Sequence, residues 1–264
     1  MKKIMQYAAY VSVGIPDRID SPERKRNLDI LLRHITLSGL KVHVLEAGER
    51  RGCFPEREDN GLTYSYVYDE SSVYHKTVYV NSLLKQATTP VVAIWDADII
   101  FPLFQLEVSA QAIMEQDYAL SIPYNGVVKM LSDKQSEAFE QSGQGCEYLA
   151  MQGYTHLMQR PSCGGVFVVN RETYLRCGGD NERFISWGPE DAERIRRMEI
   201  LGYPVHWVKD GPLYHLWHPR GENSGYATEE LAFKNRMEFV KVCSMERSEL
   251  SEYIKSWKEN ERNG

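Results

Sequence analysis

One short apolar run constrains the fold of this chain more than any other feature. Residues Val91–Trp95 are all hydrophobic and stand between Pro90 and Asp96. A short, continuous apolar run of this kind is typical of a strand buried on both faces, as in a parallel sheet covered by helices. Asp96 and Asp98 follow at the carboxyl end of that strand, which is where open α/β sheets bind their ligands.

The elements before this run alternate in type. Apolar periodicity predicts, in order, a strand at 8–15, a helix at 23–38, a strand at 41–45, a charged loop at 48–62, a strand at 64–68 and a helix at 73–87. This β-α-β order predicts a doubly wound α/β sheet.

The second half is less regular. We expect, in order, a helix at 103–117, a strand at 118–123, irregular structure at 129–160, a strand at 164–170, a short helix at 172–177, a helix from Pro189 to Leu201 and late strands at 205–208 and 213–217. The organisation expected is a catalytic domain over 1–227, with a nucleotide-binding half (1–102) and an acceptor and metal half (103–227). A C-terminal helical extension follows over 228–264.

Composition excludes several classes of protein. The 264 residues carry a formal net charge of −6 and no Lys/Arg-rich run, so no nucleic-acid partner is expected. The five cysteines are scattered without a CxxC pair, which is typical of reduced thiols. No apolar run of 18 residues and no signal-peptide cleavage site is present, so we expect no membrane span and a cytoplasmic location.

The segment Asp96-Ala97-Asp98 is the first candidate site. Two carboxylates one residue apart at a strand tip are suited to hold a hard divalent cation against a diphosphate. The alternative interpretation is a pair of solvated turn residues.

The second candidate is Trp187-Gly188-Pro189-Glu190-Asp191. Pro189 begins a helix, so Glu190 and Asp191 lie in its first turn, where the helix dipole favours anions. Adjacent helical residues project roughly 100° apart, so these two cannot form the facing pair of a glycosidase. One of them remains available as a single base, and the alternative is two acids that serve only the helix start.

The third candidate is the pair His215 and His218. On a strand this spacing puts the two rings on opposite faces, whereas a tight turn or helix brings them together. Imidazole suits Mn²⁺ or Zn²⁺ better than Mg²⁺, so either ring is a candidate ligand for the cation at Asp98. The alternative is a pair of structural histidines.

In their order and spacing, these segments resemble the β1,4-galactosyltransferase superfamily and its bacterial relatives, between Ser12 and Arg220. The matching pieces are Ile15–Arg18, Lys76–Asn81, Asp96–Asp98, Gly164–Val166, Trp187–Asp191 and His215–Arg220. The resemblance implies a GT-A-like doubly wound mixed sheet flanked by helices.

The resemblance also implies roles at the donor and metal sites. Pro16 and Arg18 match the loop that receives uridine, and Lys76 falls where the animal enzymes carry an arginine near the nucleotide. Asp96 would face the ribose or sugar of the donor. The metal ligands would be Asp98 and His218, joined by His215 where the animal galactosyltransferases use methionine.

For the acceptor side, Trp187 matches the tryptophan of a flexible loop that closes over the donor. Glu190 and Asp191 match the acceptor-binding acids, with Asp191 at the position of the general base. Pro189 replaces the glycine of the animal enzymes, which brings the mobility of that loop into question.

The Gly164-Gly165 pair marks the donor pocket in this family. Two residues before it, the animal enzymes carry a tyrosine that crowds C2 of the donor sugar, and Ser162 stands there in this chain. We therefore expect UDP-GalNAc to be accepted at least as well as UDP-Gal. The alternative is that segment 129–160 fills the space from another direction.

The function expected is that of an inverting glycosyltransferase that uses Mn²⁺ or another divalent cation. It would move Gal or GalNAc from a UDP-sugar to a carbohydrate or glycolipid acceptor, in bacterial surface polysaccharide or glycolipid assembly peripheral to the inner membrane. A nucleotidyltransferase is the first alternative, but Ser12–Arg18 lacks the expected Gly-rich basic loop. A non-catalytic carbohydrate-binding protein of the same fold is the second.

Overall fold

The computed structural model describes residues 5–35, 38–52, 61–157, 161–220 and 225–262. Within them, one sheet has the strand order β10-β6-β9-β4-β1-β2-β3 and a smaller sheet has the order β5-β11-β7-β8. The strands of the large sheet are β1 Val11–Asp17, β2 Lys41–Gly48, β3 Leu62–Tyr68, β4 Val91–Trp95, β6 Leu120–Ile122, β9 Val166–Asn170 and β10 Val205–Trp207. Those of the small sheet are β5 Ile99–Ile100, β7 Val128–Met130, β8 Thr155–His156 and β11 Leu213–His215.

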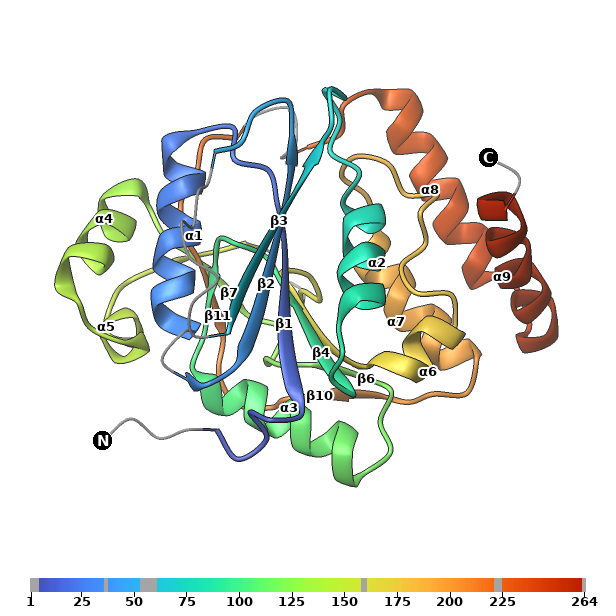
Figure 1. The fold of residues 1–264 in the computed structure, drawn as a ribbon, viewed down its shortest axis with the longest axis horizontal. Coiled ribbons are helices and arrows are strands. Elements are labelled where there is room, and N and C mark those ends of the chain that lie inside the picture. The colour runs from blue at the N-terminus through green and yellow to red at the C-terminus, as the bar shows by residue number, and fades with distance from the viewer. Residues whose placement is uncertain (1–4, 36–37, 53–60, 158–160, 221–224, 263–264) are drawn as a thin grey trace.

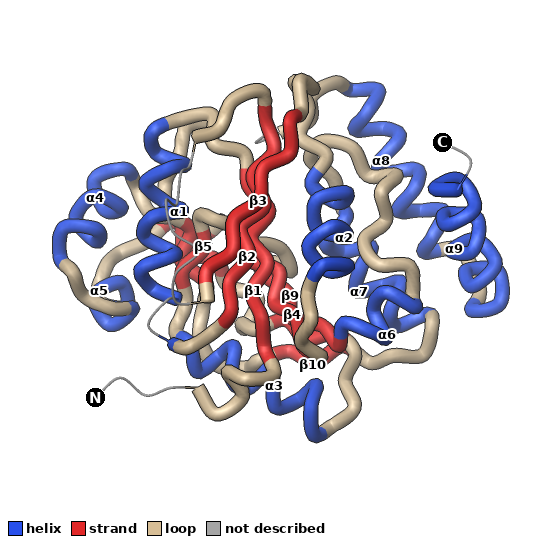
Figure 2. Tube along the Cα trace, viewed as in Figure 1, coloured by secondary structure: helices blue, strands red, loops and turns tan. Residues whose placement is uncertain are grey.

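Helices lie on both sides of the large sheet (Figures 1 and 2). They are α1 Pro22–Ile35, α2 Lys76–Gln86, α3 Leu103–Glu115, α4 Asp133–Ser142, α5 Cys146–Ala150, α6 Arg171–Arg176, α7 Glu190–Ile200, α8 Glu229–Cys243 and α9 Arg247–Arg262. In the view of Figure 1, α1 lies on one side of the strands and α2 with α7 on the other. The sheet is therefore covered on both faces, as the apolar run at 91–95 predicts.

Strand β4 occupies the middle of the sheet, and all five of its side chains are buried. It pairs in parallel with β1 and antiparallel with β9, so the sheet is mixed. The predicted strand bounds at 91–95 are therefore confirmed. Asp96 and Asp98 follow at the carboxyl end of the strand, with half-buried side chains.

The small sheet closes over this end of β4. Strand β5 begins one residue after Asp98 and pairs antiparallel with β11, so that His215 lies opposite Ile99. The next residue, Leu216, donates its backbone N–H to the carbonyl oxygen of Asp98 at 2.8 Å. The β5–β11 pairing and this hydrogen bond hold the segment after β11 beside Asp98, at the carboxyl end of β4.

The expectation of irregular structure at 129–160 is wrong. Helix α4 begins at a capping box, in which the Ser132 side chain accepts from the backbone of Gln135 and the Gln135 side chain accepts from the backbone of Ser132. It ends at Gly143 in the left-handed conformation. The helix buries only Ser136 and Phe139, so its apolar periodicity is too weak to reveal it, although its capping signature is present in the sequence.

Other expectations concern the ends of the chain and its cysteines. Helices α8 and α9 occupy most of 228–264, and the division into domains at residue 227 stays a prediction. No described helix is both long enough and apolar enough to cross a bilayer. No disulfide involves Cys146, Cys163, Cys177 or Cys243, the cysteines that the structure describes, while residues 53–60 of the expected charged loop, with Cys53, lie outside the described ranges.

Candidate active site

Three side chains form a group suited to a metal ion. Asp98, His215 and His218 each present a ligand atom, and these atoms all lie within 4.8 Å of one another. The Nε2 atom of His218 is 3.1 Å from Asp98 Oδ2, and that of His215 is 3.7 Å from the same oxygen. One carboxylate and two imidazoles form a donor set suited to Mn²⁺ or Zn²⁺, and the three side chains predicted as metal ligands therefore lie close together.

Backbone carbonyls fix the orientation of both imidazole rings. His215 Nδ1 lies 2.7 Å from the carbonyl oxygen of Leu216, and His218 Nδ1 lies 2.9 Å from that of Pro219. Because a carbonyl only accepts, each Nδ1 carries a proton, and each Nε2 faces Asp98. A hydrogen bond from the other ring nitrogen to a carbonyl oxygen commonly sets the tautomer of a metal-binding histidine.

The fold also settles how the two histidines meet. Strand β11 ends at His215, so the alternation of a strand does not extend to His218, and the two ring centroids lie 5.3 Å apart. Burial raises the pKa of Asp98, but the two facing imidazoles outweigh it and hold that pKa well below its ordinary value. Asp98 is thus a carboxylate ready to coordinate a cation.

Asp96 forms an ion pair with Lys76, the lysine that the family resemblance puts near the nucleotide. The Lys76 ammonium at the start of α2 lies 2.6 Å from Asp96 Oδ1 and 2.7 Å from Oδ2. Burial lowers the pKa of Lys76, but the charges of Asp96 and Asp191 outweigh it and raise that pKa above its usual value. Lys76 is therefore a fixed positive charge among the acids of the site.

The two glycines at the start of β9 have different reasons to be glycine. Gly165 has a φ of +88°, a left-handed conformation that other residues rarely adopt, and its carbonyl accepts from the backbone N–H of Asp96 at 2.9 Å. At Gly164, a Cβ atom would collide with Oδ2 of Asp191. The pair thus allows Asp191 and Asp96 to approach the same stretch of backbone.

The adjacent acids Glu190 and Asp191 have unlike environments. Asp191 Oδ1 pairs with the guanidinium of Arg194 at 2.7 Å, and its side chain is 27% exposed. Glu190 has a buried Oε2 atom without a hydrogen-bond partner. Burial, and then the charge of Asp191, raise the pKa of Glu190 to about 8. At neutral pH Glu190 is therefore mostly protonated and suited to donate a hydrogen bond, whereas Asp191 is an ion-paired carboxylate.

This environment predicts a pH-dependent stability. The pKa of Glu190 in the folded state (about 8) exceeds the value near 4.5 in the unfolded state. The contribution of Glu190 to the free energy of unfolding is therefore most favourable below pH 4.5. That advantage declines as the pH rises toward 8. We expect the free energy of unfolding of the wild type, relative to Glu190→Gln, to fall between pH 5 and 8.5 by on the order of a few kcal/mol, since one pKa unit corresponds to about 1.4 kcal/mol.

Urea unfolding in EDTA at pH 5, 6.5 and 8.5 measures this difference. The matched control is Glu199→Gln, because Glu199 lies on the same helix with a half-exposed side chain. The difference in free energy of unfolding between Glu199→Gln and the wild type should barely change with pH. A Glu190→Gln difference that is equally flat would contradict the assignment of a buried, protonated Glu190.

Two predicted donor-binding residues are placed at β1, and one of them is engaged elsewhere. Pro16 is buried in β1, opposite Leu45. The Arg18 guanidinium is bonded to the carbonyl oxygens of Ala47 and Ser71 and pairs with Asp69 at 2.6 Å. In this structure Arg18 therefore anchors the turn that follows β3, and its contact with uridine stays a prediction.

Ser162 lies in a buried position. The nearby phenol of Tyr124 donates to the carbonyl oxygen of Gly164 at 2.8 Å. Ser162 itself is 5% exposed. A phenol is thus present beside the Gly-Gly pair, but it comes from the segment after β6 instead of from position 162.

The Trp187 segment is held by its backbone. The side-chain amide of Asn235 on α8 donates to the carbonyl oxygens of Ile185 (2.8 Å) and Trp187 (3.2 Å), and Ser186 has a φ of +66°. The Trp187 ring is 48% exposed and packs edge-to-face on Tyr226, their centroids 4.9 Å apart. Tyr226 also lines a hollow of about 840 Å³ at the start of α8, so an open surface lies beside this segment.

Sequence reasoning missed several polar residues around the site. Asp17 is buried, and its Oδ2 atom has no hydrogen-bond partner. Burial raises its pKa to about 8. Arg194 and Asn235 were also missed, although the spacing of Arg194 three residues after Asp191 is a helical signal for an ion pair. No local pattern marks Asn235.

Comparisons with known proteins agree with this geometry. Residues 151–219 match a family model described as the N-terminal domain of galactosyltransferase, so the expected resemblance is confirmed over the part that holds the Gly-Gly, Trp187–Asp191 and His215–His218 segments. Among curated proteins, no sequence matches the chain.

Solved structures of low sequence identity share the fold. The chain is similar to Staphylococcus aureus TarS residues 1–349 in complex with UDP-GlcNAc (TM-score 0.58, 15% identity, 91% of this chain and 69% of that one). It is also similar to GalNAc-T7 with UDP, GalNAc and Mn²⁺ (0.56, 12%, 88% and 47%). A third is the mannosyltransferase PcManGT from Pyrobaculum calidifontis with GDP-Man and Mn²⁺ (0.50, 18%, 80% and 58%). The chain spans about half the length of the last two, and the expected GT-A fold is confirmed.

Proposed function

We propose that this protein is an inverting, metal-dependent glycosyltransferase that moves Gal or GalNAc from a UDP-sugar to an acceptor hydroxyl. The observation that carries the proposal is the set Asp98, His215 and His218 at the carboxyl end of β4. The charge of Asp191 raises the pKa of both Lys76 and Asp96, and this nearness to the donor-side residues supports Asp191 as the candidate base. The GT-A fold and the nucleotide-sugar complexes of its structural neighbours support this proposal.

The residues present fit a bound cation, which Asp98, His215 and His218 would hold. When bound, a divalent cation neutralises the negative charge that develops on the UDP leaving group. No general acid is then needed on the leaving-group side. Lys76 and Asp96 would orient the donor, as their fixed ion pair borders the same edge of the sheet.

The acceptor side needs one base. Asp191 has an ion-paired Oδ1 atom, and its Oδ2 atom lies against Gly164. This carboxylate would take the proton of the acceptor hydroxyl as that oxygen attacks C1 of the donor sugar, and one such displacement inverts the anomeric configuration. Glu190, protonated at neutral pH, would donate a hydrogen bond to the acceptor and position it.

Incubation with several sugar nucleotides and Mn²⁺ tests the function. We expect slow release of UDP from UDP-Gal or UDP-GalNAc even without an acceptor, and none in EDTA. Release of pyrophosphate from a nucleoside triphosphate and a sugar phosphate would instead identify a nucleotidyltransferase. Binding of sugars without any release of UDP would identify a non-catalytic binding protein. In the role proposed, the acceptor is a carbohydrate or glycolipid of a bacterial surface polymer.

We predict that UDP-GalNAc competes at least equally with UDP-Gal. Ser162 is small, and the buried Tyr124 phenol beside it is already fixed on Gly164. Ser162→Tyr should shift the preference toward UDP-Gal by at least about tenfold, because a pocket rejects a clash more strongly than a missing group. Competition between the two donors measures this ratio.

The matched control is Ser162→Ala, which removes the hydroxyl without adding bulk and should leave the ratio within a few-fold. If the wild type already prefers UDP-Gal and Ser162→Tyr leaves that ratio unchanged, Ser162 does not set the donor.

A further inference from the structure

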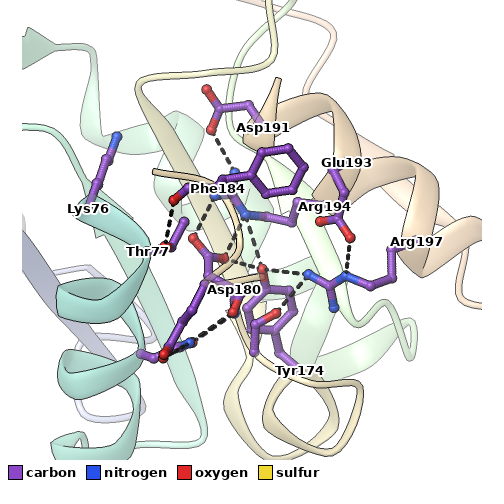
Figure 3. Close-up of polar contacts among 12 residues, drawn as sticks. Lys76, Thr77, Tyr174, Asp180, Phe184, Asp191, Glu193, Arg194 and Arg197 are labelled. Carbon is purple, nitrogen blue, oxygen red and sulfur yellow. Dashed lines mark hydrogen bonds and ion pairs between the residues drawn. The ribbon is translucent and has the colours of Figure 1, made fainter. Parts of the chain in front are cut away.

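Arg194 joins the candidate base to the interior of the protein (Figure 3). Its side chain is 2% exposed. One edge of the guanidinium donates to Asp191 Oδ1 at 2.7 Å. The other edge donates to the two oxygens of Asp180, at 3.1 Å from Nε and 2.9 Å from NH2. A single rigid cation therefore contacts one carboxylate at the site and another in the core.

Further contacts leave the guanidinium little freedom. Its plane lies over the Phe167 ring, with 3.7 Å between Cζ and the ring centroid. Its Nε atom also donates to the hydroxyl of Tyr174 at 3.0 Å, and that hydroxyl donates to Asp180. Arginine forms such multiple fixed bonds because its donors are planar and rigid. The guanidinium group that contacts Asp191 is thus held by Asp180, Tyr174 and Phe167.

Asp180 is in turn attached to the donor side of the site. Asn81 on α2 accepts from the backbone N–H of Asp180 at 2.7 Å and donates to its carbonyl oxygen at 2.8 Å. The same helix begins with Lys76, the partner of Asp96. The bonds therefore fix the place of Asp191 relative to the helix that carries the donor-side cation.

We propose that Arg194 is a positioning residue that acts through Asp191. By holding Oδ1, it sets the rotamer of Asp191 and leaves Oδ2 against Gly164 for the proton of the acceptor. This inference rests on the proposed function, in which Asp191 is the base. Catalytic groups misplaced by about 1 Å lose rate by as much as about 10²-fold, so the orientation of Asp191 matters on that scale.

The chain supplies a matched control one turn further along α7. Arg197 is fully buried and pairs with Glu193 at 2.8 Å. Its other bonds go to the carbonyl oxygens of Cys177 and Gly179, each at 2.7 Å, and to the Tyr174 hydroxyl at 3.5 Å. Arg197 therefore equals Arg194 in burial and charge, but its contacts do not include Asp191.

The experiment measures UDP release from UDP-GalNAc with Mn²⁺, water being the acceptor, for Arg194→Lys, Arg197→Lys, Asp191→Asn and the double variant Arg194→Lys/Asp191→Asn. We expect Arg194→Lys to lower kcat about 10- to 100-fold with the KM for UDP-GalNAc within about threefold, and Arg197→Lys to leave the kcat of the folded protein unchanged. The double variant should be no slower than Asp191→Asn alone, because Arg194 acts through that carboxylate.

Several outcomes would overturn the inference. If the losses of Arg194→Lys and Asp191→Asn multiply, or if Arg197→Lys lowers kcat as much, Arg194 is only structural. Should Arg194→Lys fail to fold, Tyr174→Phe replaces it, since it removes the hydroxyl that braces the guanidinium, and it should also show no added loss in Asp191→Asn. A wild type that releases no UDP from any sugar nucleotide overturns the proposed function itself, and with it this role of Arg194.

Discussion

Asp98→Asn is expected to lower the rate of UDP release by at least about 10³-fold. Loss of a bound cation removes several kcal/mol of charge stabilisation from the reaction, and each 1.36 kcal/mol is a factor of ten in rate. His218→Ala should have a similar effect, because His218 Nε2 is the nearer imidazole nitrogen to Asp98, at 3.1 Å. His215→Ala, at 3.7 Å, should weaken Mn²⁺ binding with a smaller loss of rate.

Calorimetric titration with Mn²⁺ and rate measurements against Mn²⁺ concentration separate binding from catalysis. The control is Asp210→Asn, because Asp210 is an exposed aspartate that follows β10. It should retain both binding and rate. The thermal transition of the metal-free Asp98→Asn protein should be close to that of the wild type. Full activity of the wild type in EDTA would rule out a metal-dependent reaction.

The parts of the fold that the sequence revealed are those with strong local patterns. The buried strand β4 and the helix after Pro189 each have an apolar run or a helix-start signal, and their bounds agree with the structure to within a residue. Helix α4 escaped notice because only two of its residues are buried. Apolar periodicity arises because one face of a helix is buried. A helix that is mostly exposed therefore shows little apolar periodicity in its sequence.

The residues of the candidate site likewise fall into those that local patterns reveal and those that they do not. Asp96 and Asp98 could be found because their position depends on one strand alone. Whether His215 and His218 face each other depends on where β11 ends and on its pairing with β5, which residue spacing leaves open. The engagement of Arg18 with the turn after β3 is a contact of separate segments, and no pattern near Arg18 predicts it.

The environments of Glu190 and Asp191 could not be predicted for a related reason. The two acids are neighbours in the sequence, yet Glu190 has a buried Oε2 atom without a hydrogen-bond partner, whereas Asp191 pairs with Arg194. Their difference arises from what packs around each side chain. Only the structure therefore distinguishes the surroundings of the two side chains.

Asp191→Asn is expected to cut kcat at least about 10²-fold, the usual scale for loss of a general base, with donor affinity largely retained. Asparagine keeps the shape of the side chain but cannot accept the proton of the acceptor. Glu190→Gln should cost less, since its amide still donates a hydrogen bond. If Glu190→Gln proves far more damaging than Asp191→Asn, the two roles are reversed.

Gly164→Ala tests the same base without changing it. The added methyl group would collide with Oδ2 of Asp191, so the carboxylate must turn away from the position proposed for proton transfer. We expect kcat to fall about 10-fold or more, while Mn²⁺ affinity, set by Asp98 and the two histidines, stays within a few-fold. The control is Gly153→Ala, because no heavy atom lies within 4 Å of the Cβ position at Gly153. A Gly164→Ala enzyme as fast as the wild type would mean that Oδ2 of Asp191 does not take the proton from its present position.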